Sequence, residues 1–173
     1  MKRLIVSLLF IPLFSFSQNY NADVIIYGGT SSGIAAAIES SRLGNEVILI
    51  EPTSRVGGLT TGGLGQTDIG NKQVIGGIAL EFYQNIKKYY ENSENWVWQE
   101  KHEYKDRGQT RSSITEDAMW TFEPSAALFV FNQMLDSEKI KIIYNESLES
   151  TNGVNKVNNK IKHILMESGL SIS

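Results

Sequence analysis

The residues best suited to chemistry form a glycine-rich stretch close to the start of the chain. It reads Gly28-Gly29-Thr30-Ser31-Ser32-Gly33, which fits the pattern G-x-G-x-x-G at its first and last glycines and has Thr30 at the middle one. Between a strand and a helix, such a turn offers free backbone N–H groups and a partial positive charge to a pyrophosphate. The side chain of Thr30 either donates its hydroxyl to a phosphate oxygen or crowds the site, and the sequence leaves both open.

A carboxylate stands at the spacing that this motif requires. Glu51 follows Gly33 by 18 residues and ends an apolar run, where it can accept hydrogen bonds from the hydroxyls of an adenosine ribose. A negative charge at that place repels a 2′-phosphate and favours FAD or NAD over NADP, although Arg55 nearby keeps NADP open. The alternative is a bare strand–helix–strand unit in which Glu51 is solvated.

Two strands and a helix must position these groups. The apolar run Val24–Tyr27 is followed by glycine and is typical of a buried parallel strand. Residues 34–43 are helix formers with small side chains, Gly44 ends that helix, and residues 46–50 contain a second apolar run. Residues 22–51 therefore predict one strand–helix–strand unit with a right-handed crossover.

Beyond this unit, the chain alternates between helical patterns and further strands. Apolar positions recur at helical spacing in residues 78–90 and again in residues 124–134. Residues 140–144 and 161–166 predict strands, the second after a polar stretch. Residues 52–77 hold eight of the fifteen glycines and predict a long loop that is either functional or disordered.

Aromatic and histidine side chains outside these elements are weaker candidates for chemistry. Residues 91–117 are polar and carry Trp96 and Trp98, whose rings need a partner to cover them. His102 lies in a charged stretch, and His163 lies in a predicted strand beside two lysines. We expect both imidazoles to be exposed rather than catalytic.

The composition excludes several classes of protein. The 173 residues carry 16 basic and 19 acidic side chains, and the net charge of -3 gives no reason to expect a nucleic-acid partner. Without cysteine there is no disulfide, thiolate zinc site or catalytic thiol, and we expect no metal site. The chemistry must come from other side chains or from a bound cofactor.

Residues 1–17 have the features of a secretory signal. Lys2 and Arg3 precede an apolar run that ends at Ser15-Phe16-Ser17, with small residues at the two positions that a signal peptidase reads. We expect cleavage after Ser17, a mature chain that begins at Gln18, and export without a stable membrane anchor. A membrane anchor is the alternative, but the apolar run is shorter than the ~20 residues that span a bilayer.

Taken together, residues 22–166 resemble the FAD-dependent oxidoreductases of the two-dinucleotide-binding-domain type, in which a segment R-x-G-G follows the acidic residue. Here that segment is Arg55-Val56-Gly57-Gly58. Four further segments resemble a bacterial, xanthan lyase-related branch of that family: Thr60–Asp68, Ile75–Ala79, Glu81–Tyr83 and Trp120–Pro124. Ser125 stands where histidine is expected in that branch.

The resemblance implies an α/β fold, namely a Rossmann-like FAD/NAD(P)-binding domain with a parallel sheet. This domain would span residues 18–173 and be incomplete at its C-terminus. The implied cofactor is FAD, and its pyrophosphate and adenosine half would be lined by Gly28, Thr30, Gly33, Glu51, Arg55, Gly57 and Gly58. Thr67 and Asp68 are weaker candidates for the same site.

The implied activity is hydride transfer to the flavin from a small organic substrate, with carbohydrate derivatives among the candidates. Two alternatives stay open, namely a non-catalytic truncated remnant and a carbohydrate lyase or carbohydrate-binding protein. A lyase needs a base and a group that neutralises the substrate carboxylate, and no such cluster is recognisable in the sequence.

Overall fold

The computed structural model describes residues 19–68, 70–104 and 117–173. The predicted signal segment, residues 1–17, therefore lies outside the described residues. Among the helices that are described, none is long and apolar enough to cross a lipid bilayer.

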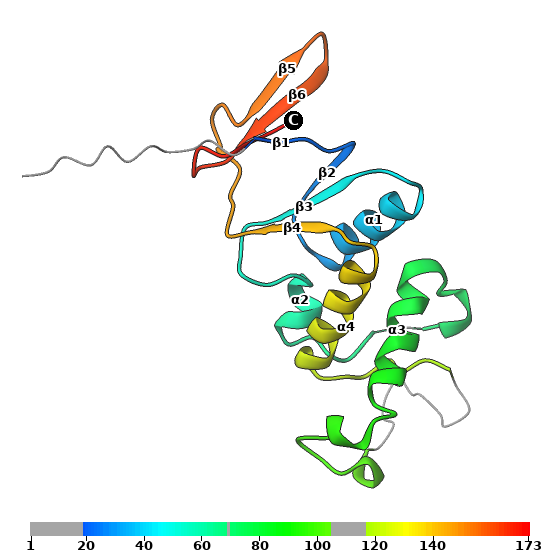
Figure 1. Cartoon of the computed structure of the whole chain (residues 1–173). Helices are drawn as coiled ribbons and strands as arrows, with labels where there is room; N and C mark the ends of the chain where they lie inside the picture. The colour runs from blue at the N-terminus through cyan, green and yellow to red at the C-terminus, as the bar shows by residue number, and fades with distance from the viewer. Residues whose placement is uncertain (1–18, 69, 105–116) are drawn as a thin grey trace, which may run out of the picture.

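A parallel three-stranded sheet forms the centre of the molecule (Figure 1). Its strands, in spatial order, are β2 (Val24–Tyr27), β3 (Val47–Glu51) and β4 (Lys141–Tyr144). Helix α1 (Ser31–Arg42) connects β2 to β3, so the predicted strand–helix–strand unit is confirmed. All five residues of β3 are buried because this strand lies between two others and is covered on both faces.

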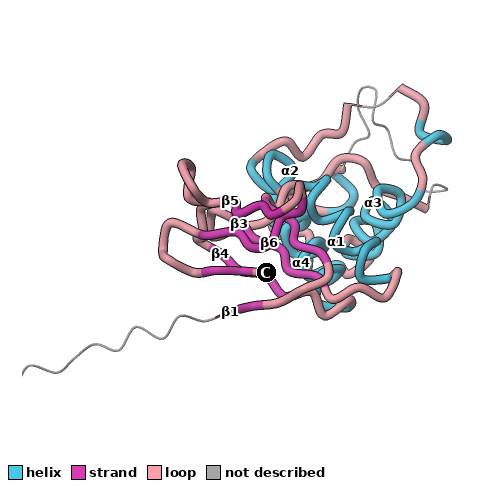
Figure 2. The backbone as a smooth tube through the Cα atoms, turned by 90° about the horizontal axis from the view of Figure 1, so that it is seen from above, coloured by secondary structure: helices cyan, strands magenta, loops and turns pink. Residues whose placement is uncertain are grey.

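Three helices cover one face of this sheet, and Figure 2 shows them gathered on one side of the strands. Besides α1 they are α3 (Gly77–Tyr89) and α4 (Pro124–Ser137), which confirms both predicted helical segments. Pro124 stands at the first position of α4, where its missing N–H costs no hydrogen bond. The rings of Phe82 and Phe131 stack at 4.3 Å between centroids and join α3 to α4 within the core.

A second sheet covers the opposite face of the parallel sheet. Its strands, in spatial order, are β1 (Asn19–Tyr20), β7 (Ser171–Ile172), β6 (Lys160–Leu165) and β5 (Val154–Val157). Strand β6 confirms the strand predicted at residues 161–166. Ile48 and Ile50 of β3 pack against Ile164 and Ile172 of this sheet and against Met166, which follows β6, while Val47 and Leu49 pack against the helices.

The polar stretch before β6 was not predicted to be a strand, but its residues Val154–Val157 form strand β5. Strands β5 and β6 pair as an antiparallel hairpin whose turn residues, Asn158 and Asn159, have φ angles of 51° and 61°. Asparagine tolerates this left-handed conformation better than most residues, so the Asn-Asn pair can form a tight turn. The side chains of β5 are exposed, and no alternation of apolar residues marked this strand in the sequence.

The glycine-rich stretch at residues 52–77 is not a plain loop. It contains the short helix α2 (Gly58–Gly62), the 3-10 turn η1 (Lys72–Val74) and a bridge between Gln66 and Thr121. Two further 3-10 turns, η2 (Ser93–Asn95) and η3 (Lys101–Glu103), follow α3.

Arg42 joins the three helices at the surface. Its guanidinium donates to both carboxylate oxygens of Glu81 on α3, at 2.7 and 2.8 Å, and to Glu138 at the end of α4, at 2.7 Å. The hydrogen bond from Arg42 lowers the pKa of Glu81 below its ordinary value. A bidentate pair of this kind fixes the relative orientation of α1 and α3 more firmly than a single contact.

The stacked phenylalanines give a direct test of this core. Phe131→Ala is expected to lower the free energy of unfolding by about 3–5 kcal/mol, because it leaves a cavity beside Phe82. Phe129→Ala on the same helix, where the ring is 46% exposed, should cost less than about 1.5 kcal/mol. Denaturant titration followed by circular dichroism measures both values. Equal losses in the two variants would contradict the assignment of Phe131 to the core.

Candidate functional site

The carboxyl edge of the parallel sheet brings the predicted site residues together. In the observed register, Tyr27 pairs with Ile50 and Glu51 pairs with Tyr144, so β2, β3 and β4 end side by side. The backbone N–H of Gly28 donates to the carbonyl of Ile50 at 2.8 Å and continues this pairing into the glycine turn. The turn and Glu51 therefore occupy the same edge of the sheet.

The glycine turn needs two of its glycines for different reasons. Gly28 has φ of 102°, a left-handed conformation that side chains disfavour, and a Cβ there would meet nothing within 4 Å. A Cβ on Gly33 would instead lie 2.0 Å from the carbonyl oxygen of Gly28. The first glycine is needed for conformation, and the last for the close approach of α1 to the end of β2.

Thr30 acts as the N-cap of α1. Its hydroxyl accepts a hydrogen bond from the backbone N–H of Gly33 at 3.3 Å and lies 3.0 Å from the hydroxyl of Ser32. The side chain is exposed, and the one backbone donor that its hydroxyl occupies is the N–H of Gly33. A threonine hydroxyl that accepts a capping bond still has its own proton to donate to a ligand.

Glu51 is buried, with only 7% of its surface exposed, and the solvated alternative is therefore wrong. One carboxylate oxygen, Oε2, accepts from the backbone N–H of Gly29 at 2.7 Å. The other, Oε1, accepts from the backbone N–H and the hydroxyl of Thr53 at 2.8 and 2.7 Å. A carboxylate has roughly four acceptor sites, so these three donors leave one for a ligand hydroxyl.

Thr53 contacts Glu51 and is not among the residues that the sequence predicts for the site. It stands two residues after the acidic residue and satisfies one oxygen of Glu51 with two donors. The same hydroxyl also contacts Arg55, whose carbonyl it approaches at 3.0 Å and whose N–H it accepts at 3.3 Å. The pattern Glu-x-Thr after a strand could have predicted this contact, because the threonine hydroxyl commonly forms hydrogen bonds with groups close to it in the sequence.

The second glycine segment docks onto the first. The backbone N–H of Gly57 donates to the carbonyl of Gly29 at 2.6 Å, and the hydroxyls of Ser31 and Thr60 lie 2.8 Å apart. A Cβ on Gly58 would lie 3.6 Å from the Cα of Thr30. Because these contacts join the two segments, five of the predicted residues (Gly28, Thr30, Gly33, Gly57 and Gly58) form one continuous backbone surface beside Glu51.

Arg55 is placed differently from the glycines. Its side chain is exposed, and within the described residues its guanidinium makes no hydrogen bond or ion pair. It therefore remains available to an anionic ligand. Thr67 and Asp68 lie outside this surface: Thr67 bonds to Trp120 and to the hydroxyl of Tyr83, and none of the observed hydrogen bonds connects either residue to the glycine turn.

Other candidate groups lie elsewhere. His102 on η3, His163 on β6 and Ser125 on the first turn of α4 are all exposed. Within the described part of the chain, no group of three or more His, Cys, Asp or Glu residues could hold a metal ion. A cavity of about 190 Å³ lies at the opposite, amino edge of the sheet, where Val47 and Lys141 begin their strands, and so it is separate from the glycine turn.

Comparisons with known proteins agree with this geometry. Residues 23–171 match the sequence model of the family described as FAD dependent oxidoreductase. Among curated proteins, none matches the sequence significantly.

Two solved structures show the same fold at low sequence identity. The 3-ketosteroid-delta4-(5alpha)-dehydrogenase from Rhodococcus jostii RHA1 is 14% identical with a TM-score of 0.52, and the match covers 88% of this chain and 44% of that enzyme. A flavin-containing monooxygenase from Stenotrophomonas maltophilia is 11% identical with a TM-score of 0.50, covering 88% of this chain and 36% of that protein. The chain thus spans less than half the length of either structure.

Substitution of Gly33 tests the close approach at the turn. Alanine normally favours a helix over glycine, yet Gly33→Ala should lower the free energy of unfolding by at least about 1 kcal/mol, because its Cβ would collide with Gly28. Ser32→Ala, one position earlier and exposed, should change it by less than about 0.5 kcal/mol. Thermal and denaturant unfolding measure both changes. A stabilising effect of Gly33→Ala would contradict the observed packing.

Proposed function

Because this chain belongs to the FAD dependent oxidoreductase family, whose cofactor is FAD, we propose that the carboxyl edge of its parallel sheet holds the adenosine and pyrophosphate half of FAD. The observation that carries this proposal is the buried carboxylate of Glu51, which has one acceptor site left beside the glycine turn. A ribose hydroxyl is a donor of the right kind for that site.

The residues around Glu51 suit the rest of this half of the cofactor. Thr30 caps the N–H of Gly33, and the N–H groups of Ser31 and Ser32 before it have no partner within the helix α1. The pyrophosphate would accept hydrogen bonds from these groups and from the hydroxyl of Thr30. The exposed guanidinium of Arg55 would neutralise part of its charge.

The glycines would let the cofactor approach the backbone closely. Both have positive φ angles, 100° at Gly57 and 54° at Gly58, and a Cβ on Gly57 would lie 2.1 Å from the side chain of Thr61, so neither position readily accepts a side chain. The negative charge of Glu51 would disfavour a 2′-phosphate on the ribose, which supports FAD over a phosphorylated dinucleotide.

The proposed reaction is the oxidation of a small organic substrate, with carbohydrate derivatives retained as candidates. The flavin, when bound, supplies the hydride acceptor. The residues of this chain would bind and orient the adenosine half and exclude water from the pyrophosphate.

We further propose that the chain belongs to the xanthan lyase-related branch of the family. Two of the four segments on which that resemblance rests are adjacent in space. Phe122 donates its N–H to the carbonyl of Gly65 at 2.8 Å, and Thr67 donates to the carbonyl of Trp120 at 3.1 Å. Segments that contact each other constrain each other's sequences, so a branch is expected to keep both segments. Their contact here supports the proposal.

Export is also part of the proposal. It is supported by the basic residues Lys2 and Arg3, the apolar run that follows and the small residues before Gln18.

Substitution of Glu51 tests the cofactor site. Glu51→Gln should weaken the binding of FAD by about 1–3 kcal/mol, because the amide cannot accept all the hydrogen bonds that the carboxylate accepts. Glu46→Gln, an exposed position just before β3 begins, is the matched control and should leave affinity unchanged. Titration calorimetry with FAD measures both.

A second measurement separates a ligand contact from a structural effect. Loss of the negative charge should also reduce the preference for ADP over its 2′-phosphorylated analogue, whereas a general weakening of the fold would leave that ratio unchanged. Equal FAD affinity in Glu51→Gln and the unmodified protein would remove Glu51 from the site.

Mass spectrometry of the exported protein tests the signal. The mature chain should begin at Gln18, and a variant with phenylalanine at positions 15 and 17 should keep the leader, because the peptidase needs small side chains there. Ser7→Leu, outside the cleavage positions, should be cleaved normally. An intact Met1 terminus on the unmodified exported protein would contradict the assignment.

A further inference from the structure

A cavity of about 280 Å³ lies at the end of α3, away from the glycine turn. Its walls come from the end of α3, from the segment that contains η2 and η3, and from the residues just before α4. It is lined by Tyr90, Trp96, Gln99, Tyr104, Met119, Thr121, Phe122 and Glu123. None of the residues proposed to hold FAD lines it.

Three electron-rich rings form one side of this cavity. The centroids of Tyr90 and Trp96 lie 4.9 Å apart, and those of Trp96 and Tyr104 lie 5.5 Å apart with the rings edge to face. Trp96 donates its indole N–H to the carbonyl of Tyr90 at 2.9 Å, so the protein itself satisfies the polar edge of this ring. The sequence predicts that the rings of both Trp96 and Trp98 need a partner to cover them. Only Trp96 is packed in this way, whereas Trp98 is 82% exposed.

A carboxylate stands among these rings. Glu123 is half-buried, its Oε2 accepts from the hydroxyl of Tyr90 at 3.0 Å, and its own backbone N–H donates to the same hydroxyl at 3.1 Å. Burial raises the pKa of Tyr90 well above its ordinary value, so this hydroxyl stays a neutral donor. No lysine, arginine or histidine lines the cavity, and none forms an ion pair with Glu123 within the described residues.

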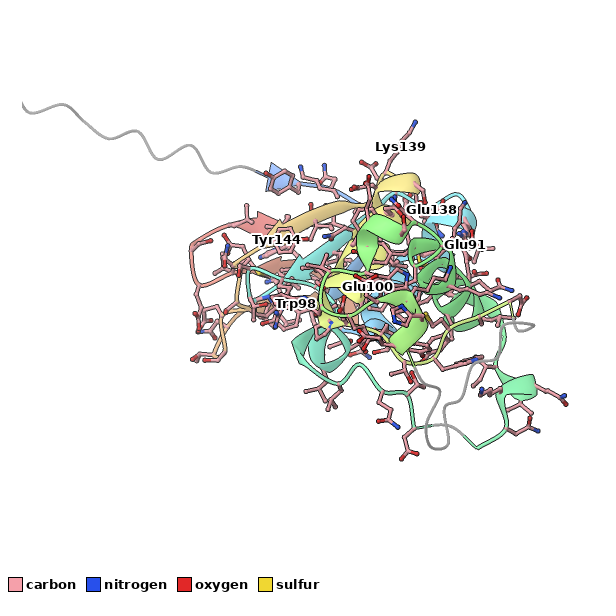
Figure 3. All side chains as sticks on the ribbon, turned by 90° about the horizontal axis from the view of Figure 1, so that it is seen from below. Glu91, Trp98, Glu100, Glu138, Lys139 and Tyr144 are labelled. Atoms are coloured by element: carbon pink, nitrogen blue, oxygen red, sulfur yellow. The ribbon has the colours of Figure 1, made fainter. Side chains whose placement is uncertain are left out.

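The described segment between Tyr90 and Tyr104 is rich in acidic residues. Glu91, Glu94, Glu100 and Glu103 belong to the segment that forms its outer wall, where the basic side chains between Tyr90 and Tyr104 are Lys101 and His102. Figure 3 labels Glu91, Trp98 and Glu100 of this segment. Such a segment repels anions and favours the approach of a cation.

We propose that this cavity binds the ammonium group of a small organic cation. The faces of tryptophan and tyrosine attract a cation through their quadrupoles, and the half-buried carboxylate of Glu123 supplies a negative counter-charge. The cavity suits an alkylated ammonium group better than an inorganic ion, because Met119 and Phe122 offer apolar surface beside the charge. This binding site is independent of the proposed FAD site.

A matched pair of ligands tests the proposal on the unmodified protein. Choline and 3,3-dimethylbutan-1-ol have nearly the same shape, but only choline carries a charge. In calorimetric titrations of the full chain with FAD present throughout, choline should bind at least about tenfold more tightly than the neutral alcohol. This comparison needs no variant and does not depend on whether FAD binds.

Two variants then identify the carboxylate. Glu123→Gln should weaken choline binding at least about tenfold, while the hydroxyl of Tyr90 can still donate to the amide oxygen and keep the local fold. Glu94→Gln removes an equal charge from an exposed position of the same segment and should change affinity less than about twofold. Thermal unfolding of each variant confirms that it is folded.

Four results would overturn the proposal. Equal binding of the two ligands would indicate an apolar cavity only, and binding of neither would indicate no site. An equal effect of Glu94→Gln and Glu123→Gln would indicate general surface charge. Choline binding that appears only after Lys105, Arg107 and Arg111 are replaced by glutamine would mean that cations of the chain itself fill the cavity.

Discussion

The hydrogen bond from the backbone N–H of Gly29 to the buried carboxylate of Glu51 connects the glycine turn to the end of β3. A carboxylate with 7% exposure is stable only if donors replace the water it has lost, and here the chain supplies three of them. The position of the turn, and through it the start of α1, depends on this satisfied charge. The carboxylate of Glu51 is also the charged group that the carboxyl edge of the parallel sheet presents to a ligand.

The two-sided burial of β3 explains where functional groups can lie. Helices cover the face that contains Val47 and Leu49, and the second sheet covers the face that contains Ile48 and Ile50. With both faces occupied, only the ends of the strands remain open to a ligand, as is general for parallel sheets covered on both faces. Gly28 and Glu51 lie at the carboxyl end, where the strands stop together.

The aromatic cavity is held by a different part of the structure. The segment before α4 pairs with the residues that follow α2, and a Cβ on Gly65 would lie 1.9 Å from the carbonyl oxygen of Phe122. This close pairing sets the position of Glu123 opposite Tyr90. The glycine-rich stretch therefore serves both regions, with Gly57 and Gly58 at the turn and Gly65 behind the wall of the cavity.

The sequence by itself determined the strand–helix–strand unit at residues 22–51 and the helices α3 and α4, because local periodicity and glycine positions specify such elements. It also determined the spacing of Glu51 from the glycine turn. Only the tertiary structure decided that Glu51 is buried, that Thr53 satisfies it and that Trp96 is covered while Trp98 is not. The bond between Tyr90 and Glu123 joins residues 33 positions apart, and contacts at that separation depend on how helices and sheets pack, which no local pattern records.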